Sequence, residues 1–135
     1  FYLPENRDTF DFTNYDYIVD AIDTVTAKID MICYAKSVKT PIISCMGCGN
    51  RMDPTQLELT DIYKTKNDPL AKVMRHELKK RHINKCKVVC SKELPVKTHY
   101  TEQDSKKRSV PGSTAFVPSA AGLICASYIV RELIK

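Results

Sequence analysis

The chain has 135 residues, of which 43% are hydrophobic and 27% are charged, and its formal net charge is +5. This length predicts one domain with its own hydrophobic core, and the composition is ordinary for a soluble globular protein. The longest apolar stretch, 115–130, is interrupted by proline and serine, so no membrane span is expected. No secretory signal is visible, and a core of this size does not need disulfides. These features favour a cytoplasmic protein with reduced cysteines.

The hydrophobic pattern predicts strands and helices that alternate along the chain. In chain order, the expected segments are a strand end with a connecting loop (1–14), a buried strand (17–22), a helix from Thr24 or Thr26 to about Lys39, a second buried strand (41–44), a loop (46–54), a half-buried strand (56–60), a helix (68–82), a short strand (86–91), an exposed mobile loop (93–112), a last strand (113–117) and a closing helix capped by Ser119 (120–135). We expect Leu123, Ile124, Tyr128 and Leu133 of the closing helix to face the core. This order predicts a mixed-sheet α/β fold whose first two strands are parallel.

Two acidic residues, Asp20 and Asp23, lie at the carboxyl end of the first predicted strand. Ligands of open α/β sheets bind outside the carboxyl ends of strands, and Mg²⁺ is bound by one or two carboxylates together with phosphate oxygens and water. The two residues therefore predict a nucleotide site, with Asp23 as the metal ligand; the alternative for Asp23 is a helix cap, equally compatible with the spacing. No Gly-rich phosphate loop precedes this strand, and the chain starts at Phe1. We therefore expect the C-terminal half of a larger nucleotide-dependent enzyme, a single partial domain that is inactive on its own.

Two close cysteine pairs, Cys45 with Cys48 and Cys86 with Cys90, are candidate ligands of a zinc ion. The second pair has Cys-x₃-Cys spacing inside a predicted strand, whereas zinc knuckles use a turn-forming CxxC, so no structural zinc is expected. The first pair, in CMGC, is also compatible with redox chemistry. It leads into a Gly-rich loop and not into a helix N-terminus, which favours thiols that line an active site or have no role.

Basic residues on the predicted helix 68–82 and in the loop 93–112 are candidate contacts for RNA phosphates: Lys72, Arg75, Lys79, Lys80, Lys106, Lys107 and Arg108. Contacts of this kind make binding salt-dependent. The alternative is an ordinary solvated helix face, which is the commoner fate of such residues. His76, His82 and His99 have no ligand spacing and are expected on the surface.

Motifs along nearly the whole chain resemble one family. They are VDAIDTVTAK, PIISCMGCGNRMDPTQLELTDIYKTKNDPLAKVMRHELKK, KVVCSKELP and FVPSAAGLICASYIVREL. Together they resemble the ThiF/MoeB/HesA superfamily of adenylating enzymes, which are related to ubiquitin-activating enzyme. Within it, GNRMDPT, DIYKT and DPLAK are similar to the branch of tRNA threonylcarbamoyladenosine dehydratases (TcdA or CsdL). The resemblance implies the C-terminal half of a Rossmann-like ThiF-type fold, with a mixed sheet and flanking helices.

This resemblance implies an ATP-dependent, ligase-like reaction on tRNA by a homodimer. ATP would adenylate the carboxylate of a threonylcarbamoyl group attached to an adenosine of tRNA, and ring closure would then expel AMP. Asp23 matches the family's aspartate that binds Mg²⁺ with ATP, Lys28 lies where relatives often carry Arg, and Asp20 completes the expected cofactor-binding set. ATP and Mg²⁺ would be bound mainly by the N-terminal half that is absent from this chain.

Two other functions remain as alternatives. A ThiF/MoeB-type enzyme that activates a sulfur carrier or ubiquitin-like protein would work with a cysteine desulfurase or sulfur acceptor, but such enzymes usually carry zinc CxxC pairs. The chain could also serve only as an RNA-binding or dimerisation module. Cys45 and Cys48 stand where members of the branch usually show Ser and a small residue, so neither is assigned as a catalytic thiol.

Overall fold

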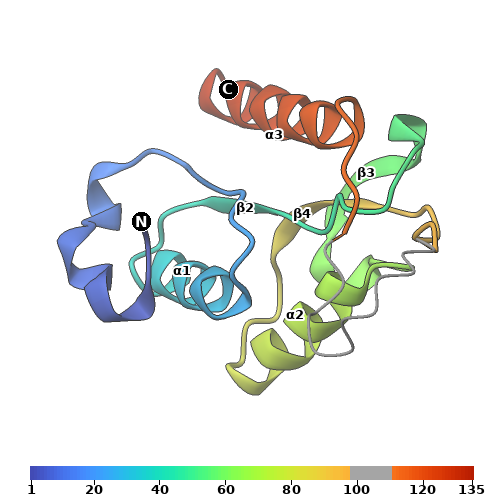
Figure 1. The fold of residues 1–135 in the computed structure, drawn as a ribbon. Helices are drawn as coiled ribbons and strands as arrows, with labels where there is room; N and C mark the ends of the chain where they lie inside the picture. The colour runs from blue at the N-terminus through green and yellow to red at the C-terminus, as the bar shows by residue number, and fades with distance from the viewer. Residues whose placement is uncertain (98–110) are drawn as a thin grey trace.

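A four-stranded sheet with helices on both faces forms this protein (Figure 1). The computed structural model describes residues 1–97 and 111–135. Its strands and α-helices are, in chain order, β1 (Ile18–Asp20), α1 (Val25–Ser37), β2 (Ile42–Cys45), β3 (Leu57–Asp61), α2 (Pro69–Lys80), β4 (Lys87–Ser91) and α3 (Val117–Leu133). In Figure 1, α3 covers one face of the sheet, and α1 and α2 cover the other. None of the helices in the described residues is long and apolar enough to cross a membrane.

The strands lie in the order β1-β2-β4-β3. β1, β2 and β4 are parallel, and β3 runs antiparallel to β4 at one edge. In the register of the parallel strands, Asp20 lies opposite Ser44, which in turn lies opposite Val88. The carboxyl ends of the three parallel strands therefore meet at one edge of the sheet, where α/β folds bind ligands. The predicted mixed sheet and its parallel first unit are confirmed.

Side chains that alternate along the strands supply a core to each helix layer. Ile42 and Val88 pack with α1 and α2, whereas the next residues, Ile43 and Val89, pack with α3. Both faces of β2 and β4 are covered, and both strands are accordingly rich in β-branched apolar residues, as is typical of parallel sheets.

α2 begins as the sequence predicts. Asp68 is its N-cap, and Oδ1 of Asp68 accepts a hydrogen bond of 2.9 Å from the backbone N–H of Ala71. Pro69 follows at the first helical position, where its missing N–H costs nothing. α1 begins after Thr24, one of the two predicted caps, although the Thr24 side chain makes no capping hydrogen bond.

The N-terminal segment differs from the prediction. Residues 1–14 contain two short 3₁₀-helices, Pro4–Thr9 and Phe12–Asn14, and no strand. Phe12 is buried and stacks on Tyr34 of α1, with ring centroids 4.5 Å apart. Aromatic packing against α1 holds this segment, and such packing leaves no periodic pattern in the sequence.

The C-terminal prediction is also partly wrong. The expected strand at 113–117 is absent, and α3 starts at Val117, before the predicted cap. Ser119 donates a hydrogen bond of 2.5 Å from Oγ to the carbonyl oxygen of Ala115 and does not cap the helix. A short apolar run has the same pattern in a strand as in the first turn of a helix. The sequence that leads into Val117 is therefore compatible with either structure.

The inward face of α3 is narrower than predicted. Ile124 and Tyr128 pack against the sheet as expected, but Leu123 is 71% exposed and Leu133 is 55% exposed. Part of the predicted mobile loop, residues 98–110, lies outside the described residues. This part includes His99, Lys106, Lys107 and Arg108.

Candidate functional site

A buried ion pair joins three elements at the carboxyl end of β1. Nζ of Lys28 lies 3.0 Å from Oδ1 of Asp20, and neither side chain has exposed surface. Ser44 of β2 donates a hydrogen bond of 2.5 Å from Oγ to Oδ2 of Asp20. Lys28 also donates to the carbonyl oxygen of Ile22, at 3.0 Å, and the Ile22 N–H donates to Asp20. The pair therefore fixes the turn between β1 and α1.

Asp20 and Lys28 lie on the side of the sheet that faces α1. Asp20 shares this side with Ile18, because residues two apart on a strand point the same way. Their predicted contact with a nucleotide stays a prediction. In this structure their polar atoms bond to each other and to the turn, which presents Asp23 to solvent.

Asp23 is exposed at the start of α1. The N-cap position belongs to Thr24, so the helix-cap alternative for Asp23 is not observed. Among the hydrogen bonds of the described residues, the Asp23 carboxylate accepts none. A carboxylate with free lone pairs at a strand end fits the oxygen ligands that Mg²⁺ takes from proteins.

A cavity of about 850 Å³ lies beside Asp23, between the carboxyl ends of β1 and β2 and the first turns of α3. Its volume is within the range of small-molecule sites, about 300–1,000 Å³. Asp23 is the only charged side chain among the described residues that line it. A second cavity, of about 950 Å³, lies between α1 and α2 and contains none of the predicted site residues.

The Gly-rich loop after β2 forms one wall of the cavity beside Asp23. A Cβ atom at Gly49 would lie 2.8 Å from Cβ of Pro111, so only glycine allows this close approach. Asn50, in the left-handed region with φ 56°, exchanges two hydrogen bonds with Gly112. The backbone N–H of Gly47 donates to Oδ2 of Asp68, at 3.1 Å, which ties this wall to the start of α2.

Three thiols meet at the cavity. Sγ of Cys45 lies 3.9 Å from Sγ of Cys48, and Cys125 of α3 packs against the same cluster. Hydrogen bonding with Cys125, together with burial, raises the pKa of Cys45 to about 12. Hydrogen bonding to Cys45, then burial, also raises the pKa of Cys48, while the Cys45 thiol lowers the pKa of Cys125. Cys45 and Cys48 are therefore protonated at neutral pH.

The two cysteine pairs of the sequence do not come together. Cys45 and Cys48 pack on the α3 side of the sheet, whereas Cys86 and Cys90 are buried in the core beneath α1 and α2. Burial raises the pKa of Cys86 and of Cys90 to about 12. In residues 1–97 and 111–135, no three His, Cys, Asp or Glu side chains are arranged to hold a metal ion.

The basic residues of α2 lie away from the cavity. Leu70 at the start of α2 lines the cavity, and Lys79 lies about 14 Å further along the helix axis at 1.5 Å per residue. Lys72, Lys79 and Lys80 are exposed, and Lys80 forms an ion pair of 3.0 Å with Glu77. These lysines form a solvent-facing surface. Their contact with RNA stays a prediction, and so does the alternative of an ordinary solvated helix face.

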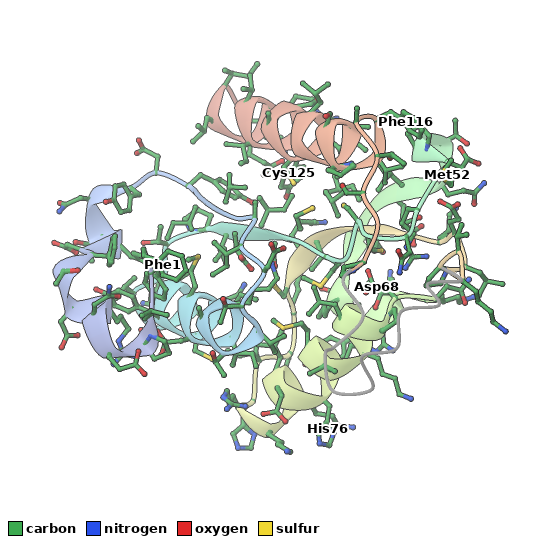
Figure 2. All side chains as sticks on the ribbon, viewed as in Figure 1. Phe1, Met52, Asp68, His76, Phe116 and Cys125 are labelled. Carbon is green, nitrogen blue, oxygen red and sulfur yellow. The ribbon has the colours of Figure 1, made fainter. Side chains whose placement is uncertain are left out.

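Arg75 is only half-buried and differs from its lysine neighbours. Its Nη1 donates to the carbonyl oxygen of Thr65, at 3.1 Å, and to the Thr65 hydroxyl. His76 points outward from α2 in Figure 2, and His82 is exposed just after the helix. Both histidines therefore lie on the surface, as the sequence predicts.

Sequence reasoning missed the role of Ser44 and the partner of Lys28. The sequence does indicate that Lys28 has a buried partner. Lys28 lies in the apolar stripe of α1, three residues after Val25 and four before Ile32. A lysine in a buried stripe requires an anionic partner. The acid at the adjoining strand end on the same side is Asp20.

Comparison with characterised proteins shows close relatives. The tRNA threonylcarbamoyladenosine dehydratase of Bacillus subtilis (strain 168) is 39% identical over 145 residues, which covers 100% of this chain and 57% of the relative. The enzyme of the same name from Escherichia coli (strain K12) is 40% identical over 79 residues, covering 58% of this chain and 30% of that protein. The chain thus spans little more than half the length of the first relative and less of the second. No protein-family model matches the chain.

Solved structures are similar over almost the whole chain. Escherichia coli tRNA N6-threonylcarbamoyladenosine dehydratase, TcdA, in complex with ATP has a TM-score of 0.84 and 28% identity, covering 99% of this chain and 54% of that one. The same enzyme in complex with AMP has a TM-score of 0.82 and 29% identity, covering 99% and 55%. The predicted α/β adenylating fold, with a mixed sheet and flanking helices, is confirmed.

Proposed function

Because this chain is a relative of the tRNA threonylcarbamoyladenosine dehydratases over its whole length, we propose that it forms the C-terminal part of an ATP-dependent tRNA-modifying enzyme. In the proposed reaction, the carboxylate of a threonylcarbamoyl group on tRNA is adenylated and then cyclised, with release of AMP. A free carboxylate is a poor acyl donor until it carries a good leaving group, which is what ATP supplies. The protein's part is positioning and charge stabilisation.

The observation that carries this proposal is the position of Asp23. Its carboxylate is exposed, accepts no hydrogen bond among the described residues and borders a cavity of about 850 Å³ at the carboxyl ends of β1 and β2. The donor set fits Mg²⁺, which would be held by Asp23 together with phosphate oxygens and water. The bound ion would reduce the charge on the phosphates during attack.

Asp20 and Lys28 act in this proposal as positioning residues. Their ion pair anchors the backbone of the turn that carries Asp23, which keeps this residue at the mouth of the cavity. The described lining of the cavity contains no cationic side chain, and one carboxylate cannot replace a phosphate cradle. The phosphate contacts would come from the part of the relatives' length that this chain does not span.

The proposed full enzyme is a cytoplasmic homodimer that binds tRNA through Lys72, Arg75, Lys79 and Lys80, with Lys106, Lys107 and Arg108 in residues outside the described part. Sulfur-carrier activation is less well supported. Enzymes of that kind usually carry zinc CxxC pairs, whereas here the pair Cys45 and Cys48 and the pair Cys86 and Cys90 lie on opposite faces of the sheet.

Calorimetric titration of Mg-ATP tests the proposal. The 135-residue chain is compared with the same chain preceded by the N-terminal region of the Bacillus subtilis relative, and AMP release is measured with tRNA that carries threonylcarbamoyladenosine. Binding and AMP release are expected only from the longer protein. Micromolar binding of Mg-ATP by the short chain would show a nucleotide site other than the one proposed, and AMP release without tRNA would contradict the substrate.

A further inference from the structure

Cys45 and Cys48 are placed for disulfide formation. Their Sγ atoms are 3.9 Å apart, and a disulfide bond is about 2.05 Å long, so the sulfurs need to approach by about 1.9 Å. Rotation about the two Cα–Cβ bonds can supply much of this movement. No backbone rearrangement of a whole element is required.

The local backbone also permits this approach. Cys45 is the last residue of β2, and Cys48 lies between Gly47 and Gly49 in the loop that follows. Glycine on both sides of Cys48 gives the loop freedom to move that other residues would not. The fixed partner is Cys45, which the β2 ladder holds beside Val89.

We propose that Cys45 and Cys48 form a reversible dithiol–disulfide pair whose oxidation closes the loop beside Asp23 and weakens nucleotide binding. The oxidant is a small disulfide such as glutathione disulfide. One protein thiolate attacks the oxidant and releases one small thiol, and the other protein thiolate attacks the mixed disulfide and releases the second. Two electrons and two protons pass to the oxidant, which becomes two thiols for each protein disulfide formed.

The thiol environment predicts a slow and persistent modification. The raised pKa values of Cys45 and Cys48 leave little thiolate to attack an oxidant at neutral pH. High-pKa thiols are also poor leaving groups, so the disulfide, once formed, is reduced slowly. The pair therefore responds to sustained oxidation and not to brief changes.

Cys48 lines the cavity beside Asp23, and so do the residues on either side of it. The Gly47 N–H is hydrogen-bonded to Asp68, and Gly49 is in close contact with Pro111. Both glycines line the same cavity as Asp23, so displacement of the loop changes the shape of the cavity. The effect on nucleotide binding rests on the proposed function, whereas the disulfide itself does not.

Cys125 offers the competing disulfide. It lies on the sheet-facing side of α3 and is 2% exposed (Figure 2). A bond from Cys45 to Cys125 would tie the sheet to a packed helix, whereas the bond to Cys48 involves only the Gly-flanked loop that follows β2. The geometry therefore favours Cys48 as the partner.

Peptide mapping tests the disulfide directly. Trypsin cleaves after Lys39 and Arg51, so Cys45 and Cys48 fall in one peptide, 40–51. After incubation of the chain with glutathione disulfide and alkylation of free thiols, this peptide is expected to appear unalkylated and two hydrogens lighter, and to return to the dithiol with dithiothreitol. Cys48→Ser should abolish the product, and Cys33→Ser, on α1, should leave it unchanged.

Two results of the peptide mapping would overturn the proposal. A cross-link between peptide 40–51 and the peptide that contains Cys125 would show that Cys125, and not the second cysteine of peptide 40–51, is the disulfide partner. A peptide 40–51 that stays fully reduced, while the same peptide made synthetically is oxidised in the same buffer, would show that the fold prevents the bond.

Calorimetry with Mg-ATP on the longer protein tests the effect on binding. Oxidation is expected to raise Kd at least about tenfold, and Cys48→Ser should make Kd insensitive to the oxidant. Equal Kd values for a reduced and a verified disulfide form would overturn the effect on binding. Failure of both forms to bind would instead contradict the proposed function and leave the disulfide result standing.

Discussion

Lys28 and Asp20 form an ion pair of 3.0 Å with no exposed surface on either side chain. Its place at the junction of β1, β2 and α1 makes it part of the fold, although each residue alone looks like a ligand of a nucleotide. Burial of two charges is costly, and the cost is offset only when each charge keeps its partner and its hydrogen bonds. The consequence is that the two residues cannot be changed independently.

Lys28→Met should lower the free energy of unfolding by about 3–5 kcal/mol, because it leaves the Asp20 carboxylate buried without a counter-charge. Urea denaturation of the chain measures this change. The matched control is Lys36→Met, at an exposed position of the same helix, where the change should stay within about 0.5 kcal/mol. The double variant Asp20→Asn with Lys28→Met should recover part of the loss. A single variant as stable as the original chain would contradict the structural role of the pair.

Asp23→Asn should weaken Mg-ATP binding and abolish AMP release by the longer protein while the fold stays intact. The side chain is exposed and bonds to nothing else in the described residues, so the change in unfolding free energy should be within about 0.5 kcal/mol. Calorimetry and urea denaturation measure the two effects separately. Asp16→Asn, at another exposed acid just before β1, is the control and should leave both unchanged. Retained turnover in Asp23→Asn would show that the metal ligand lies elsewhere.

Lys72→Glu with Lys79→Glu should weaken tRNA binding by the longer protein and flatten its dependence on salt. Removing one lysine that binds a phosphate reduces the slope of log K against log salt by about one. Fluorescence anisotropy at several salt concentrations gives this slope. Lys39→Glu, exposed after α1, is a control with the same change of charge per residue at a site that we do not assign to RNA. An unchanged slope in the double variant, or an equal loss of affinity in the control, would leave α2 as an ordinary solvated face.

Local signals in the sequence were sufficient for much of the fold. Asp68 followed by Pro69 marks the start of α2 because cap chemistry acts within a few residues. The parallel pairing of β1 with β2 follows from chain order, since a strand, a helix and a strand connect in only one common way. Predictions of this kind need no knowledge of distant parts of the chain.

The candidate site was harder to predict because interactions across the fold decide it. The sequence places Asp20 and Asp23 at one strand end, but three residues of separation put one carboxylate in the core and the other in solvent. Likewise, the interaction of Cys45 with Cys125 joins residues eighty positions apart, and no local pattern reports it. Which acid can bind a ligand depends on what covers each side of the sheet.

Two substitutions in α3 test which side of this helix faces the sheet. Ile124 packs against the sheet, so Ile124→Ala should lower the unfolding free energy by about 2 kcal/mol, at the low end for such a truncation because the side chain is only partly buried. Leu123, the adjacent residue, is 71% exposed, so Leu123→Ala should change it by no more than about 0.5 kcal/mol. Urea denaturation measures both changes. The protein concentration is kept low so that chains do not associate through the exposed Leu123. Since the sequence alone predicts that both residues face inward, equal losses would support that prediction and contradict the rotation of the helix seen here.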